Sequence, residues 1–133
     1  MRIDFIKFDE IKKYKEVNKE KIDKVLKSLC GRCKEYIKNN NIKFDIEKLD
    51  DRIEIENMLI DLLNENEYKM LVVDYMSYLL NKNLKDFEDL KREWDVLDWK
   101  DYDEIDLMNE NVNMIFNDII DNLDIKYIKY ILS

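Results

Sequence analysis

The chain has 133 residues, of which 46% are apolar and 41% charged, and its formal net charge is −8. This length allows one ordinary hydrophobic core, so we expect a single globular domain over residues 1–133, and the apolar content excludes a disordered acidic tail. The longest aliphatic run, Met70 to Val73, is far shorter than the ~20 residues of a membrane span. Charges also interrupt the N-terminus where a secretory signal has a hydrophobic block, so we expect a cytoplasmic protein.

The first third of the chain contains one well-marked helical pattern and two segments that could be extended. Residues 2–8 fit either a strand or a short helix. From Asn18, apolar residues recur at helical spacing until the asparagines at 39–41 end the pattern, which predicts a long helix. Residues 42–47 alternate apolar and charged side chains with period two, the pattern of a half-buried strand. The two extended segments, 2–8 and 42–47, would together form a minor two-stranded element.

Two helices are predicted in the middle of the chain. Asp51 and Glu54 have the spacing of a capping box, so the first helix is expected over 52–64. The second, over 67–81, is the more apolar, and we expect it at the centre of the bundle. Its polar residues share one side at helical spacing, which predicts a narrow stripe facing solvent rather than a buried acid; they are Glu67, Asp74, Ser77 and Asn81.

The C-terminal part contains three further predicted helices. The first has an inner apolar stripe, formed by Leu84, Phe87, Leu90, Trp94 and Leu97. A turn near 98–103 separates it from a helix over 104–123, and the tail 125–133 fits a short last helix. The whole pattern predicts an all-α, or mostly α, protein: a compact bundle of five to six helices.

The one compact motif is Cys30-Gly31-Arg32-Cys33, which holds the only glycine. Two cysteines at this spacing can exchange electrons or supply half of a zinc site. A thioredoxin-like site should follow a strand, however, and a complete zinc site needs further Cys or His, which the chain lacks. We therefore expect both thiols to pack in the core, with redox chemistry and intermolecular metal binding as alternatives. Gly31 would mark a kink or a tight helix contact.

Composition argues against most catalytic constellations. The chain has no histidine, the usual general base, and a single glycine, which excludes a phosphate-binding loop. Carboxylates three residues apart on a helix could hold Mg²⁺, but with 31 acidic residues such spacings arise by chance. We expect a protein without enzymatic activity, cofactor or metal. The alternative is a helical carboxylate-metal phosphohydrolase, with candidate pairs Glu20/Asp23, Glu47/Asp50, Asp86/Asp89 and Asp118/Asp121.

The net charge lies entirely in residues 86–110, which hold eleven acidic and three basic residues, while the remainder sums to zero. The chain lacks Ala, Thr, Pro, Gln and His, as expected from an AT-rich genome, whose codons favour Lys. An acidic segment runs against this bias and is therefore stronger evidence of a function. As a continuous helix it would present one carboxylate per about 3.4 Å, comparable to the phosphate spacing along a nucleic-acid strand. We predict a partner-binding surface with interleaved aromatic residues, formed by Asp86, Asp89, Glu93, Asp95, Asp98, Trp99, Asp101, Tyr102, Asp103, Glu104 and Asp106.

Such a surface favours a small acidic binding protein that occupies the basic surface of a nuclease or other nucleic-acid-binding enzyme and inhibits it. Phage-encoded inhibitors of restriction or CRISPR systems have this general character. One alternative is an immunity protein that neutralises a cognate nuclease toxin, and another is that the acids only keep the protein in solution. Direct nucleic-acid binding is disfavoured, because the lysines of the N-terminal third are interspersed with acids. The charge polarity also permits head-to-tail self-association, and a homodimer is a further alternative.

Overall fold

The computed structural model describes residues 3–97 and 102–133, without the side chains of residues 94–97 and 102–104. These residues form seven helices, which are α1 Phe8–Val17, α2 Lys19–Asn39, α3 Leu49–Leu62, α4 Glu65–Leu80, α5 Phe87–Leu97, α6 Tyr102–Asp121 and α7 Ile125–Ile131. The all-α prediction is confirmed, although the described ranges hold seven helices instead of five to six and contain no strand. Within them, no helix combines the length and the apolar character that crossing a membrane requires.

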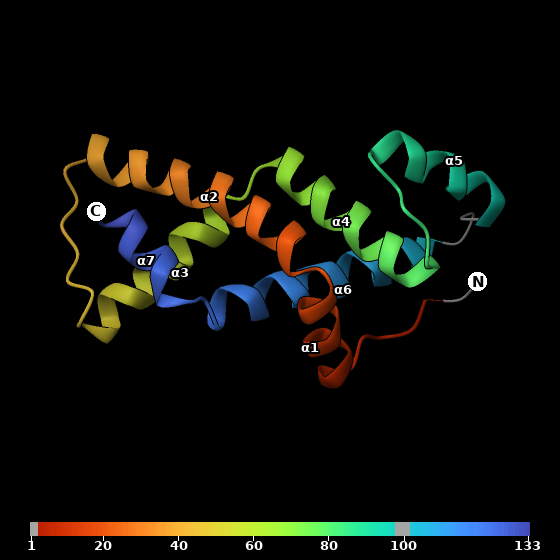
Figure 1. Ribbon diagram of the computed structural model, residues 1–133, viewed down its shortest axis with the longest axis horizontal. Helices are drawn as coiled ribbons and strands as arrows, with labels where there is room; N and C mark the ends of the chain where they lie inside the picture. Colours follow the sequence, from red (N-terminus) through yellow and green to blue (C-terminus); the bar gives the residue numbers. More distant parts are fainter. Residues whose placement is uncertain (1–2, 98–101) are drawn as a thin grey trace.

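The bundle is elongated (Figure 1). One end holds α5, and the other holds the C-terminus beside the segment that joins α2 to α3. The long helix α2 packs against α1, α3, α4 and α7, whereas α4 packs against α2, α5 and α6. The prediction that residues 67–81 form the central helix is therefore wrong. The central helix is α2, because its buried face continues over most of its length through Ile22, Val25, Leu26, Leu29, Cys30, Cys33 and Ile37.

The additional helix is α1, in which a short apolar stripe meets favourable charges at both ends. Ile11 and Tyr14 are buried, and the Tyr14 ring packs edge-to-face against the rings of Tyr75 (6.1 Å between centroids) and Tyr78 (5.4 Å). Acidic residues lie in its first turn and a lysine in its last, which suits the helix dipole. Two buried residues among ten make too weak a pattern to predict a separate helix from the sequence.

The predicted two-stranded element is absent from the described residues, although the alternation behind it is real. Ile42, Phe44 and Ile46 are half-buried against the core, and the charged residues between them are exposed. The two segments cannot pair, because residues 3–7 lie far along the bundle from residues 42–47 (Figure 1). Alternating burial thus marks an extended segment lying on the core, but a strand also needs a neighbour to bond with.

Residues 3–7 are held instead by one buried amide on α6. The Asn111 side chain accepts a hydrogen bond from the backbone N–H of Ile6 (3.0 Å). It donates to the carbonyl of Asp4 (2.8 Å) and to the hydroxyl of Tyr75 (3.0 Å). A buried amide costs free energy unless its polar atoms are paired, and here the oxygen and the nitrogen both are. The contact ties the N-terminal segment to α6 and α4.

The two middle helices begin differently from the prediction. α3 starts at Leu49, and Asp51 accepts the backbone N–H of Asp45 (2.7 Å) instead of capping the helix. The capping box lies one helix later, at the start of α4. There Asn64 accepts the backbone N–H of Glu67 (2.8 Å), and the Glu67 carboxylate accepts the backbone N–H of Asn64 (3.1 Å). Both places have the same spacing to a glutamate, so spacing alone does not tell them apart.

Candidate functional site

The predicted acidic surface includes α5, at one end of the bundle (Figure 1). α5 packs against α4, with Leu90 fully buried and Phe87 half-buried, so its apolar stripe faces the core. The structure describes the side chains of four predicted site residues, which are Asp86, Asp89, Glu93 and Asp106. The other predicted residues, or their side chains, lie outside the described part: Asp95, Asp98, Trp99, Asp101, Tyr102, Asp103 and Glu104.

Three of the four described acids have structural partners. Asp86 accepts the backbone N–H of Asp89 (2.9 Å) and so caps α5, while Asp89 accepts the backbone N–H of Lys85 (2.9 Å). Glu93 pairs with Lys82 (2.6 Å), which precedes the helix. These contacts hold the start of α5 in place, and the ion pair with Lys82 neutralises part of the negative charge of this helix.

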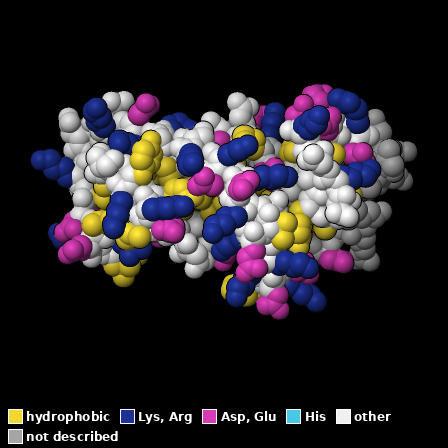
Figure 2. Space-filling view, in the orientation of Figure 1, with side chains coloured by type: hydrophobic (Ala, Val, Ile, Leu, Met, Phe, Trp, Pro, Cys, Tyr) yellow, Lys and Arg dark blue, Asp and Glu magenta, His cyan; other side chains and the backbone are white. Residues whose placement is uncertain are grey.

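Four described acids of the segment are exposed: Asp86, which caps α5, and Glu88, Asp106 and Glu110, which we define as the acidic end. Glu88 makes an ion pair with Lys91 one turn away (3.4 Å), and pairs this exposed contribute little to stability. Figure 2 shows acidic side chains gathered beside basic ones over α5, whereas Lys and Arg side chains spread over the face that α2 presents. Among the described residues of the 86–110 segment, the acidic end is the part best placed to meet a partner.

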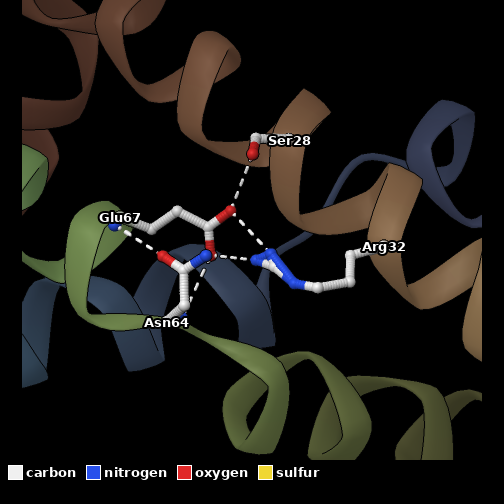
Figure 3. Close-up of polar contacts among 4 residues, drawn as sticks. All are labelled: Ser28, Arg32, Asn64 and Glu67. Carbon is white, nitrogen blue, oxygen red and sulfur yellow. Dashed lines mark hydrogen bonds and ion pairs between the residues drawn. The ribbon is translucent and has the colours of Figure 1, made fainter.

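A buried charged cluster joins α2 to α4, and it contradicts the predicted solvent stripe. Glu67 is only 3% exposed. Its carboxylate accepts hydrogen bonds from the hydroxyl of Ser28 (2.8 Å) and from the guanidinium of Arg32, with one contact of 3.0 Å and a second, shorter contact to the other oxygen (Figure 3). The backbone N–H of Asn64 completes the set of donors. The position that the sequence pattern assigns to solvent is thus a junction between two helices.

The cluster satisfies a buried charge from within the protein, which is the condition for burying one. The arginine fork contacts both carboxylate oxygens, the strongest form of such a pair, and this holds Arg32 in place at the surface. One signal in the sequence could have located Glu67 at a helix start, namely its spacing from Asn64. Nothing local points to Arg32, because it comes from a different helix.

The other members of the predicted stripe also differ in exposure. Ser77 is buried and accepts the backbone N–H of Leu84 (3.2 Å), while Asn81 is exposed and ends α4 in the left-handed conformation (φ 53°). The Asp74 side chain is 14% exposed, with the Lys21 ammonium 4.0 Å away. Burial raises the pKa of Asp74 above its ordinary value, and nearby lysines only partly offset this effect. Asp74 is therefore the largely buried acid that the stripe interpretation rejected.

Cys30 and Cys33 are fully buried free thiols of α2, which confirms core packing. Burial raises the pKa of Cys30 to about 12 and that of Cys33 to about 11, so neither is a thiolate at neutral pH. The predicted tight helix contact at Gly31 is wrong. An added Cβ there would meet the Tyr130 hydroxyl at 3.8 Å, an ordinary van der Waals distance.

Several of the carboxylates proposed for Mg²⁺ are engaged in other contacts, including Asp86 and Asp89 at the start of α5. Asp23 accepts a hydrogen bond from the Tyr127 hydroxyl and pairs with Lys27 (3.1 Å). Asp118 pairs with Lys15 (2.5 Å). In the part of the chain that the structure describes, no three His, Cys, Asp or Glu side chains are grouped as a metal site would require. The metal-dependent alternative therefore gains no support from the geometry.

No protein-family model matches the chain. No curated protein and no solved structure matches it either. The functional proposals therefore rest on the geometry described above.

Proposed function

We propose that this protein binds a basic surface on a nucleic-acid-handling enzyme and inhibits that enzyme by occupying the surface. The observation that carries the proposal is the acidic end, whose carboxylates are exposed within the segment that holds the whole net charge. This segment begins on α5, at one extremity of an elongated bundle (Figure 1). A charged extremity can approach a groove more closely than the flank of the same molecule can.

The two faces of α5 suit this role. Leu90 and Phe87 pack toward the core, which leaves the outer face of the helix for a partner, with Glu88 exposed on it. The hydrogen bonds made by Asp86 and Asp89 hold the start of the helix in place. Binding would therefore not carry the entropy cost of ordering this turn. The acids of residues 95–106 continue the same charge in sequence and stay predicted contacts.

Carboxylates of this kind compete with phosphates for the same Lys and Arg side chains of a partner. Attraction between the two surfaces speeds their encounter, and dissolved salt screens it. Inhibition then requires no chemistry from this chain, because the nucleic acid is excluded by occupancy alone.

The proposal is tested with a variant that reverses the acidic end, Glu88→Lys/Asp106→Lys/Glu110→Lys. Wild type and variant are immobilised, and proteins retained from the native cells are identified by mass spectrometry and then challenged with duplex DNA. We expect wild type to retain a nucleic-acid-binding enzyme that DNA displaces and that the free protein inhibits. The variant should bind this enzyme roughly tenfold more weakly or worse.

The matched control reverses three exposed acids on α3, as Asp50→Lys/Glu54→Lys/Asp61→Lys. It changes the net charge by the same amount and should bind like wild type. Circular dichroism and urea unfolding establish that both variants fold. Equal binding by the acidic-end variant and wild type would contradict the proposal, as would a partner that duplex DNA does not displace.

A further inference from the structure

A surface cleft of about 590 Å³ lies beside the C-terminal half of α2, next to α7 and the start of α4. A cavity of this volume lies within the range of small-molecule sites. Cationic, amide and aromatic side chains line it, together with the single glycine of the chain: Arg32, Lys34, Lys38, Asn64, Tyr130 and Gly31. Of its three cationic side chains, Arg32 is already paired with the buried Glu67 carboxylate, so Lys34 and Lys38, against the carboxylate of Glu35, set the charge that the cleft presents to a ligand.

Two of the cations are positioned by other parts of the fold. The guanidinium of Arg32 is fixed by the buried Glu67 carboxylate, as Figure 3 shows. The Lys34 ammonium lies 4.7 Å from the centre of the Tyr130 ring and donates a hydrogen bond to the Ser133 hydroxyl (2.8 Å). Cations held in this way lose less side-chain entropy when an anion binds, so they favour binding more than mobile surface lysines do.

Gly31 supplies a second, independent observation. A glycine inside a helix destabilises it by roughly 1 kcal/mol relative to alanine. Close packing does not demand it here, because an added Cβ would lie 3.8 Å from the nearest side-chain atom, the Tyr130 hydroxyl. The missing side chain instead leaves room in the wall of the cleft.

We propose that this cleft binds a small phosphate ester of mononucleotide size. The phosphate groups pair with the ammonium groups of Lys34 and Lys38, which are usual partners of phosphate. Arg32, whose charge Glu67 balances, contributes only N–H donors at the edge of the cleft. The ring of the ligand lies against Tyr130, whose side chain is 48% exposed. The proposal is independent of the acidic end, which lies on α5 and α6.

The test is isothermal titration calorimetry of the full chain at low ionic strength, with ATP, AMP and pyrophosphate as probes. We expect ATP to bind, and Lys34→Ala/Lys38→Ala to weaken its binding by roughly tenfold or more. The control Lys12→Ala/Lys13→Ala removes the same charge from α1 and should bind ATP like wild type.

A cleft-filling variant separates ligand binding from stability. Gly31→Leu introduces a larger side chain into the cleft wall, so ATP binding should be lost. Gly31→Ala, whose Cβ fits at 3.8 Å from the Tyr130 hydroxyl, should be at least as stable as wild type and should still bind ATP, and urea unfolding of both variants gives their stability. Absence of binding with all three probes overturns the proposal, as does equal ATP affinity of the Lys34/Lys38 and Lys12/Lys13 variants. Pyrophosphate binding as tight as ATP binding overturns the ring contact. Tighter binding of a single-stranded oligonucleotide overturns the small-molecule assignment.

Discussion

Asp74 lies on α4 beside α2, where little solvent reaches its carboxylate and Lys21 approaches only to 4.0 Å. Tyr14, on α1, is fully buried, and its hydroxyl has no hydrogen-bond partner among the described residues. Burial raises the pKa of the Tyr14 phenol, and the negative charge of Asp74 raises it further. Asp74 therefore disfavours the ionised form of Tyr14, and burial disfavours the ionised form of Asp74 itself, so an uncharged side chain at position 74 should suit the fold better.

We predict that Asp74→Asn stabilises the protein at neutral pH. An aspartate ordinarily has a pKa of 3.8, and burial places the folded-state pKa of Asp74 above it. Between these two values the folded protein binds more protons than the unfolded chain, so wild-type stability falls as pH rises through the interval. In urea unfolding from about pH 4 to about pH 7, the free energy of unfolding of the variant relative to that of wild type should increase as the pH rises.

The exposed Asp61→Asn on α3 serves as the control for this experiment. Its stability relative to wild type should change little over the same pH range. If Asp74→Asn is less stable than wild type at neutral pH, the attraction of Lys21 outweighs the cost of burial and the prediction is wrong.

The contact between helices α2 and α4 contains the ion pair of the partly exposed Arg32 and the buried Glu67, with Ser28 as a further donor. Removing one member of such a pair leaves the other without its partner, which costs more than the pair itself contributes. Replacing both by apolar side chains of similar length removes that penalty. The two helices can therefore be tested as a coupled unit.

We predict that Arg32→Met, which leaves the buried Glu67 carboxylate without its partner, destabilises the protein by about 3 kcal/mol. Glu67→Met should cost less, because the Arg32 guanidinium still reaches solvent. The double variant should cost less than the sum of the two single variants, because the second change leaves no further charge unpaired. Free energies of unfolding from urea titrations give the coupling directly. Additive single effects would show that the two side chains act independently and that the pair does not join α2 to α4.

On the scale of the whole molecule, charge of opposite sign lies on different elements. α2 holds seven basic and three acidic residues, and the segment 86–110 holds eleven acidic and three basic ones. Several basic side chains of α2 form ion pairs with acids of this chain, and several acids around α5 form ion pairs with its bases. The exposed carboxylates of the acidic end should therefore dominate the attraction of a basic partner.

For the partner retained by wild type, we predict an association rate that falls steeply between about 50 and about 300 mM salt. Surface plasmon resonance measures this dependence. The acidic-end variant should show a shallower slope. The α3 control changes the net charge by the same amount but leaves the acidic end intact, so it should keep a slope close to that of wild type. A rate that does not change with salt would argue against electrostatic recognition.

Much of the helical content could be predicted because apolar spacing is a local property. The periodicity over Ile22 to Ile37 and from Phe87 to Leu90 marks real helices, although Leu84 lies before α5, and the alternation at 42–47 marks real alternating burial. Charge counting likewise locates the acidic segment without any structure. These properties depend only on neighbours in the chain, so the sequence by itself determined them.

Partnership between distant residues was decided by the tertiary structure alone. Glu67 is buried because α2 brings Ser28 and Arg32 to it, and a polar residue on a helix carries no local sign of such donors. The segment 42–47 forms no strand because its expected partner lies elsewhere in the bundle (Figure 1). In the candidate site, Glu93 forms an ion pair with Lys82, which precedes α5, whereas Glu88 stays exposed. Burial and pairing depend on which elements meet, and only packing in three dimensions settles that.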